Sequence, residues 1–315
     1  MGVTITPADV DPSGVGFRGP SGDGVPEGGE GYSSGAAWKM VLRVFIENKL
    51  AIVGLGMIVL MTLFCFVGPL IYKTQQVFNN PAIANKPPGP GHLLGTNPVG
   101  YDVLGRLMLG GQTSLEIGFA AAIIAVLIGV IWGAAAGLAG GIVDAVMMRI
   151  VDAFLAIPFL FLLIVLGAIF TTSILELIIV IGLVAWLVPA RLVRGETLSL
   201  RVREYVQAVK VMGGGTRRIL FRHIIPNTVG TIVVNATFQV ADAILYVATL
   251  SYLGLGVPPP ATNWGHQLAN GLSYVYAGYW WLIYPAGIAI IITVVAFNFV
   301  GDALRDALEV RLQSR

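Results

Sequence analysis

The chain has 315 residues, of which 56% are hydrophobic and only 11% are charged, with a net charge of +2 and a mean hydropathy of +0.81. Because soluble domains carry about 25% charged residues, this composition excludes an ordinary soluble protein and indicates one that crosses a membrane several times. The single cysteine, Cys65, excludes an internal disulfide framework and a metal site built from several thiolates.

The first 36 residues form a polar segment rich in Gly, Pro, Ser and acidic residues, and Arg18 is their only basic residue. They contain no long apolar run and therefore do not predict a cleavable signal peptide. Such a segment cannot bury enough apolar surface to offset the entropy of ordering, so we expect a disordered cytoplasmic tail. We expect residues 37–112 to hold an amphipathic segment, the first membrane helix and an external segment.

Six apolar stretches are long enough to cross a hydrocarbon core about 30 Å thick as helices. In chain order they are residues 50–72, 117–143, 153–175, 173–193, 228–253 and 280–301. A polar hinge at Thr171, Thr172 and Ser173 makes the third and fourth a helical hairpin. The sequence therefore predicts an all-α polytopic membrane protein with a core at residues 113–303 and a cytoplasmic C-terminal tail at 304–315.

The orientation follows from the basic residues. Six spans place both termini on one side, and that side collects 16 of the 19 Lys and Arg residues, leaving only Lys73, Lys86 and Arg106 on the other. Because cytoplasmic loops are enriched in Lys and Arg, we expect both termini to be cytoplasmic. The segment 254–279 is then external and contains no Lys, Arg, Asp or Glu.

Small residues recur in the second stretch at every fourth position, at Gly129, Gly133, Gly137 and Gly141. This spacing places them on one face of a helix, where they allow another backbone to come close. Two interpretations stay open, packing within the chain or a seam between two subunits.

Polar residues form a stripe on the fifth stretch, at Thr231, Asn235, Gln239 and Asp242. Polar side chains facing lipid are costly, so the stripe should face protein or water. It is either one wall of a solute pathway or a polar seam against another helix or subunit. Asp242 is the strongest single candidate for a pathway residue, because an ionised carboxylate needs a partner or water.

The densest basic run lies between the fourth and fifth stretches, in EYVQAVKVMGGGTRRILFRHIIPN at residues 204–227. Residues 202–212 predict a helix, and the three glycines that follow stop it, because glycine accepts the left-handed conformation. We expect Thr216 to cap a second short helix that contains three arginines, and Pro226 to close it. From these residues alone, the segment that holds the two helices is either exposed to solvent or rests on anionic lipid.

The pattern from Gln207 to Gly213, followed by Pro226, resembles the EAA motif of ABC-importer permeases, although Gln207 stands where that motif has Glu. Three further segments resemble the dipeptide/oligopeptide branch of that family. Taken together, the four motifs are most similar to the C-type permease subunit of that branch. The three segments are HLLGTNPVGYDVLGRLMLG at 92–110, SYLGLGVPPPATNWGHQLANG at 251–271 and FNFVGDALRDAL at 297–308.

The resemblance implies a type I importer fold in which residues 202–226 form a coupling helix that docks on a cytoplasmic ATPase. The residues that it assigns to this helix are Glu204, Gln207, Ala208, Val209, Gly213, Arg217, Arg218, Arg222 and Pro226. It further implies a second, homologous permease, two ATPase subunits that bind ATP and Mg²⁺, a peptide-binding protein outside the cell, and a place in the bacterial plasma membrane.

Other functions are tested by what the sequence lacks. The sequence has no G-x-x-x-x-G-K-[ST] phosphate loop, so we expect nucleotide to bind elsewhere. The three histidines lie far apart, which argues against a histidine metal site. No set of catalytic residues and no nucleic-acid site stands out. A proton-coupled carrier that uses Asp242 remains an alternative, as does a permease of the same branch for nickel, glutathione or an oligosaccharide. A membrane-embedded enzyme is a poorer candidate.

Overall fold

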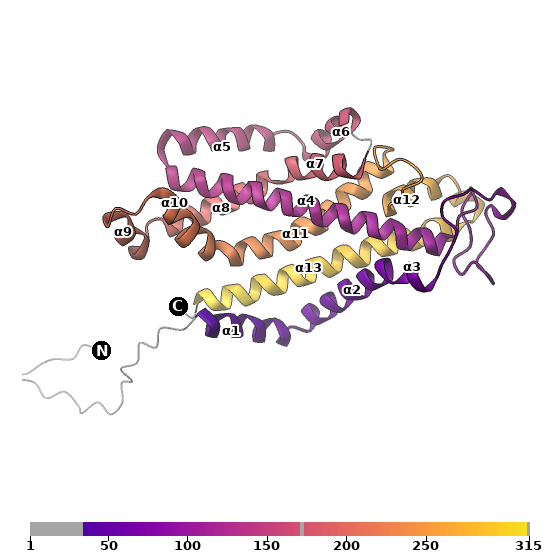
Figure 1. Cartoon of the computed structure of the whole chain (residues 1–315), viewed down its shortest axis with the longest axis horizontal. Coiled ribbons are helices and arrows are strands. Elements are labelled where there is room, and N and C mark those ends of the chain that lie inside the picture. Colours follow the sequence, from indigo (N-terminus) through magenta and orange to yellow (C-terminus); the bar gives the residue numbers. More distant parts are fainter. Residues whose placement is uncertain (1–33, 171–172, 314–315) are drawn as a thin grey trace, which may run out of the picture.

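The computed structural model describes residues 34–170 and 173–313, and its regular elements are all helices. Long helices run side by side along the molecule (Figure 1). They are α2 (Lys49–Phe66), α4 (Val103–Ala139), α8 (Leu187–Leu200), α11 (Ile225–Tyr252) and α13 (Tyr284–Gln313). The start of α1 (Ser34–Glu47) lies at the same end as the end of α13, whereas α3 (Gly68–Ile71) and α12 (Trp264–Leu272) lie at the other.

Four of the helical segments are long and apolar enough to cross a membrane, and two bent pairs bring the total to six if each pair is one span. The prediction of an all-helical polytopic protein is thus confirmed. Residues 1–33 of the predicted tail lie outside the described residues, and the hinge residues Thr171 and Thr172 do too.

The third expected span is the clearest correction. Residues 153–175 do not form one straight helix, because α5 (Gly141–Leu155) ends before Pro158 and α6 (Phe159–Phe170) begins after it, with an angle of 83° between them. A residue that precedes proline is driven out of the helical conformation, which explains the break at Ile157.

The fourth span is also bent, by 41°, between α7 (Ile174–Ala185) and α8.

The second span begins before its apolar stretch and ends within it, and the last span runs past the end of its stretch. α4 begins at Val103 rather than residue 117, since Asp102 caps it by accepting a hydrogen bond from the Gly105 amide at 2.9 Å. It ends at Ala139, because Gly140 and Gly141 both have positive φ. α13 continues past residue 301, where Ala303 and Ala307 are still buried.

The glycine face of α4 packs against α8. A Cβ added at Gly133 would lie 2.2 Å from the carbonyl oxygen of Ala190, and one at Gly129 would lie 2.5 Å from the Cβ of Pro189. Gly137 approaches Thr197 in the same way, whereas Gly141 lies past the break, and a Cβ added there would meet no described residue within 4 Å. The interpretation as packing within the chain is therefore confirmed for three glycines and wrong for the fourth.

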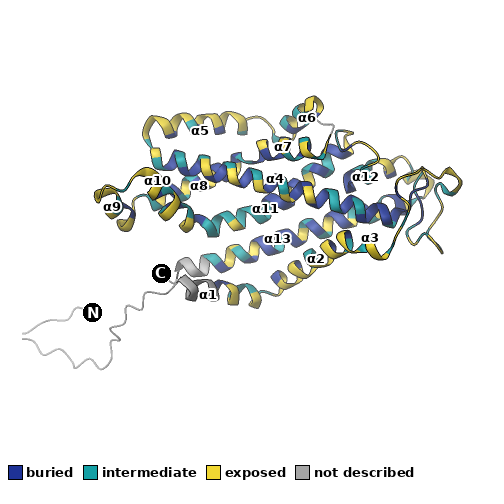
Figure 2. Cartoon of the chain, viewed as in Figure 1, coloured by how far each residue is buried: buried dark blue, intermediate teal, exposed yellow. Residues whose placement is uncertain are grey.

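Apolar side chains are exposed along the outer faces of α2, α5 and α6, whereas the buried residues of these helices face their neighbouring helices (Figure 2). Leu60, Ile142 and Phe161 are between 61% and 83% exposed. In a chain of this composition such surfaces suit lipid contact.

Two ion pairs join α5 to α8, and they differ in burial. Arg194 binds both carboxylate oxygens of Asp144, at 2.5 and 2.7 Å, with side chains 31% and 12% exposed. Arg191 meets Asp152 at 2.5 Å, with side chains 56% and 49% exposed.

We expect Arg194→Ala to lower the free energy of unfolding by about 2 kcal/mol, because it leaves a largely buried carboxylate without its partner. The matched control is Arg191→Ala, whose exposed pair should contribute less than about 1 kcal/mol. Thermal unfolding of the purified protein in detergent measures both, and equal shifts would contradict the assignment.

Candidate functional site

A pair of short helices projects at the end of the molecule that holds α1 and the end of α13 (Figure 1). α9 (Glu204–Val211) is followed by Gly213, whose φ of +81° is left-handed, and then by α10 (Thr216–Ile219). The predicted stop at the glycines therefore lies where the structure turns.

Two details of that prediction are wrong. Thr216 is the first residue of α10 rather than its cap, because Gly215 occupies the capping position and no side chain caps the helix. Pro226 does not close a helix, since α10 runs through a π-helical turn (Leu220–Ile224) into α11. Pro226 stands in the first turn of α11, where its missing N–H is tolerated.

One face of α9 is packed into the body of the protein. Val206 is 2% exposed and joins a buried cluster with Ile219, Ile224 and Val193, the last of which belongs to α8. The Gln207 side-chain amide donates to the Arg201 carbonyl at 2.8 Å, and Arg201 donates to the Gly137 carbonyl of α4 at 2.8 Å. α9 is therefore joined to α8 through the Val206 cluster and, by way of Arg201, to α4.

The opposite face of this helix pair is exposed and both apolar and basic. Val202, Val211, Met212 and Phe221 are between 57% and 86% exposed. The residues around them that are also exposed are Glu204, Gln207, Ala208, Arg217, Arg218, Arg222 and Pro226, while Val209 is half-buried. Phe221 and two of the arginines border a shallow hollow with Gly215. This surface suits a partner that offers an apolar groove with acidic edges.

The polar stripe of α11 divides into three environments. The Thr231 hydroxyl donates to Glu196 of α8 at 3.1 Å, and the buried Oδ1 of Asn235 has no hydrogen-bond partner among the described residues. Gln239 is buried and donates to the Ala185 carbonyl at 2.7 Å, whereas Asp242 is exposed. The stripe is therefore partly a seam between helices, and a pathway role for it stays a prediction.

Glu196 was not found by the sequence pattern. It lines a cavity of about 420 Å³ together with Thr231, Asn235 and Arg305, which come from three helices. No spacing within one helix connects Glu196 or Arg305 to the stripe, so only the packing of α8, α11 and α13 reveals this cluster.

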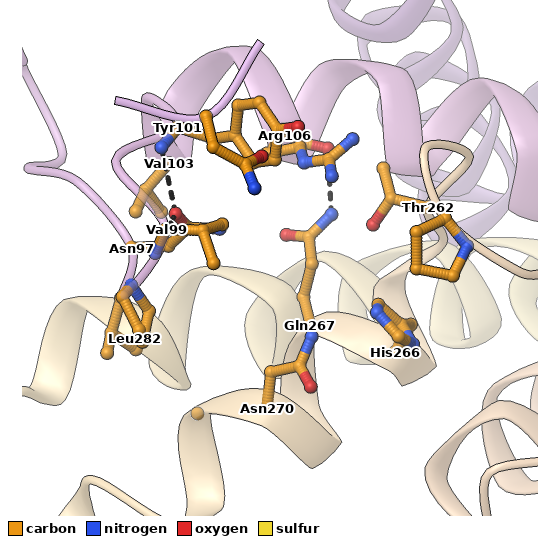
Figure 3. Close-up of a pocket in the computed structure, with 14 residues that line it drawn as sticks. Asn97, Val99, Tyr101, Val103, Arg106, Thr262, His266, Gln267, Asn270 and Leu282 are labelled. Carbon is orange, nitrogen blue, oxygen red and sulfur yellow. Dashed lines mark hydrogen bonds between the residues drawn. The ribbon is translucent and has the colours of Figure 1, made fainter. Parts of the chain in front are cut away.

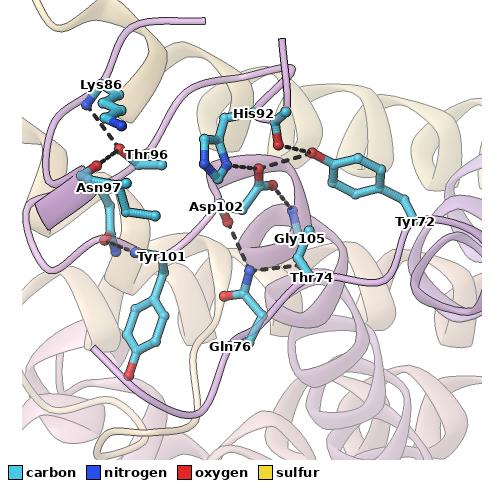
Figure 4. A network of polar contacts seen from close by, with 12 residues as sticks. Tyr72, Thr74, Gln76, Lys86, His92, Thr96, Asn97, Tyr101, Asp102 and Gly105 are labelled. Carbon is cyan, nitrogen blue, oxygen red and sulfur yellow. Dashed lines mark hydrogen bonds and ion pairs between the residues drawn. The ribbon is translucent and has the colours of Figure 1, made fainter. Parts of the chain in front are cut away.

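At the other end of the molecule, Asp102 holds the segment before α4 in place (Figure 4). Its side chain is 3% exposed, and its carboxylate accepts a hydrogen bond from the Tyr72 hydroxyl at 3.0 Å. Nδ1 of His92 lies 3.0 Å from the same carboxylate oxygen. Burial and the hydrogen bond to Asp102 raise the pKa of Tyr72 above its usual value. The Gln76 amide donates to the Asp102 carbonyl, so several points of the segment are fixed to the start of α4.

Comparison with known proteins identifies the family. Residues 125–314 match the family described as binding-protein-dependent transport system inner membrane component, and residues 37–88 match the N-terminal TM domain of oligopeptide transport permease C. The first match covers more than half of the chain. The chain belongs to this family of transport permeases.

Relatives of the permease are similar over nearly their whole length. The oligopeptide transport system permease protein OppC of Bacillus subtilis is 43% identical over 276 residues, which cover 88% of this chain and 90% of that protein. The OppC protein of Escherichia coli K12 is 42% identical over 274 residues, with coverage of 86% and 90%. A dipeptide transport system permease protein, DppC of Bacillus subtilis, is 36% identical.

An inward-facing structure of the MetNI methionine ABC transporter has a TM-score of 0.51 at 21% identity, covering 63% of this chain and 94% of that one. At this identity the likeness concerns the fold, and it supports the predicted importer architecture. The permease is thus a multi-pass membrane protein. The match at 125–314 includes α9, α10 and α11, while the start of α4 lies between the two matched regions.

Proposed function

We propose that this permease is one of two membrane subunits of an ATP-driven importer, and that it carries peptides delivered by a binding protein outside the cell. The relatives named for oligopeptide and dipeptide transport support peptides as the cargo. The observation that carries the coupling is the helix pair α9–α10, exposed on one face and packed through Val206 onto the spans on the other.

In this proposal, ATPase subunits bind ATP and Mg²⁺ and grip the exposed face of α9–α10. The basic residues Arg217, Arg218 and Arg222 pair with acidic groups on the ATPase or with anionic lipid. Closure of the ATPase dimer moves α9, and α4 and α8 move with it because Arg201 and the Val206 cluster join them. A second, homologous permease supplies the other half of the pathway.

The orientation in the bacterial plasma membrane follows from the same proposal. The end with α9, α10 and the last turns of α13 faces the cytoplasm, in agreement with the distribution of Lys and Arg. The opposite end, with the segment fixed by Asp102, receives the binding protein. Thr231, Asn235, Gln239 and Asp242 remain candidates for the pathway wall.

The test is uptake by the complete complex in proteoliposomes, with the binding protein outside, ATP and Mg²⁺ inside, and a radiolabelled tripeptide as cargo. We expect uptake that requires ATP, survives a protonophore and persists in Asp242→Asn. If instead uptake ignored ATP, collapsed with the protonophore and vanished in Asp242→Asn, the chain would be a proton-coupled carrier. Competition by nickel, glutathione or an oligosaccharide, but not by peptides, would replace peptides as the cargo.

A further inference from the structure

A pocket lined by apolar and polar residues opens at the end of the permease opposite α9 (Figure 1), and Figure 3 shows its lining. It has a volume of about 370 Å³ and lies between the start of α4, the segment before it, and α12. This volume is within the range of small-ligand sites. The polar side chains that matter most are Asn97, Arg106, His266, Gln267 and Asn270.

Arg106 is nine-tenths buried in this pocket, and its guanidinium forms no ion pair with any residue that the structure describes. Its Nη1 donates to the Pro260 carbonyl at 2.7 Å, and the guanidinium carbon lies 4.1 Å from the centre of the Tyr101 ring. None of the described carboxylates forms an ion pair with it, and none of the residues lining the pocket is acidic. Buried arginines are normally paired, so an anionic group is the ligand that this guanidinium suits best.

Arg106 is also the only fixed charge among the lining residues. His266 lies in α12, and its pKa is lowered by burial and by the nearby Arg106. The imidazole is therefore neutral at neutral pH, where it offers a hydrogen bond without adding charge. The pocket presents one guanidinium and several uncharged polar groups.

The neighbouring amides offer both donors and acceptors. Asn97 uses its oxygen to accept from the amides of Val99 and Tyr101, which leaves its nitrogen to donate. Gln267 donates from its nitrogen to the Arg106 carbonyl at 2.7 Å, which leaves its oxygen to accept. Asn270 is exposed at the opening. A peptide group, with one N–H and one C=O, matches such a pair.

We propose that this pocket binds the C-terminal carboxylate of the incoming peptide on Arg106, with the last peptide group on the amides of Asn97 and Gln267. The inference rests on the proposed function and specifies which end of the cargo the permease recognises. Guanidinium and carboxylate form strong charge-assisted hydrogen bonds. The opposite polarity is disfavoured, because a peptide ammonium would meet Arg106 and no acidic side chain.

The main test uses Asn270→Asp, an isosteric change of an exposed residue that places a carboxylate in the pocket. The complete complex in proteoliposomes is supplied with binding protein loaded with trialanine or with trialanine amide, below half-saturation. We expect Asn270→Asp to lower the uptake rate of trialanine by about tenfold relative to trialanine amide, since the added charge neutralises Arg106. Arg106→Gln should shift the ratio in the same direction.

The matched control is Ser273→Asp, which adds the same charge to the exposed residue that caps α12, outside the pocket lining. It should leave the ratio unchanged. Comparing the ratio between variants cancels any preference of the binding protein itself, because the same loaded protein is used throughout.

Other outcomes would overturn the inference. If Asn270→Asp lowered the uptake of both peptides equally and raised the concentration of binding protein needed, the pocket would hold an acidic side chain of that protein. An unchanged ratio in both pocket variants would show that Arg106 serves structure alone. Either result leaves the proposed function standing, whereas absence of ATP-driven uptake of any peptide by the unaltered complex would remove that function.

Discussion

Gly213→Pro is expected to abolish ATP-driven uptake while leaving the permease in the membrane. Gly213 has a φ of +81°, and its amide donates to the Lys210 carbonyl at 3.1 Å. Proline is restricted to a φ near −65° and has no N–H, so it can adopt neither feature. The turn between α9 and α10 would have to open, and the exposed face that we assign to the ATPase would lose its shape.

Position 215 provides the control within the same turn. Gly215 has a φ of −68°, which proline adopts without strain, and no described residue lies within 4 Å of an added Cβ. Gly215→Pro should therefore keep most of the uptake. The measurements are membrane content by immunoblot, co-purification with the ATPase and ATP-driven uptake. Normal uptake with Gly213→Pro would show that force does not enter through this element.

Gly133→Leu should have the largest effect on stability. A side chain at this position would collide with the backbone of α8, because even a Cβ would lie 2.2 Å from the Ala190 carbonyl oxygen and 2.9 Å from the Arg194 nitrogen. A backbone cannot rotate away as a side chain can, so α4 and α8 must separate. We expect a loss at or above the roughly 3 kcal/mol that marks severe overpacking, measured as thermal unfolding of the purified permease.

The same substitution at Gly56 is the control. Gly56 lies on the exposed face of α2 with nothing within 4 Å of an added Cβ. Gly56→Leu should leave the unfolding temperature unchanged or raise it, since leucine favours helix over glycine. If Gly133→Leu left the isolated permease equally stable and prevented only its association with a second subunit, these glycines would form a seam between subunits.

Much of the fold could be predicted from residues that lie close together in the sequence. Apolar length predicted the spans, the glycine run predicted the turn at Gly213, and the spacing of Gly129, Gly133 and Gly137 predicted a close helix contact. One error came where contacts override the local pattern. α4 starts 14 residues before its expected boundary, because Asp102 caps it and the segment before α4 is hydrogen-bonded to its start through Gln76.

The candidate sites show the same division. The helix pair α9–α10 could be located from its glycines and basic residues, but the sequence could not show that Val206 is its inner contact. The stripe on α11 was visible as a spacing, yet Gln239 bonds to α7 and Asp242 is exposed. Periodicity gives the face of a helix, and only packing shows what that face meets.

The sequence by itself determined that this chain is a helical membrane protein with a basic, glycine-broken element between its spans, because hydropathy, charge and backbone freedom are properties of neighbouring residues. Only the tertiary structure decided that Arg106 is buried without an ion pair to any described carboxylate, beside amides that come from residue 97 and from α12. Arg106 and Gln267, which are joined by a hydrogen bond, are separated by 161 residues along the chain. Their meeting depends on how the helices pack, which no local pattern encodes.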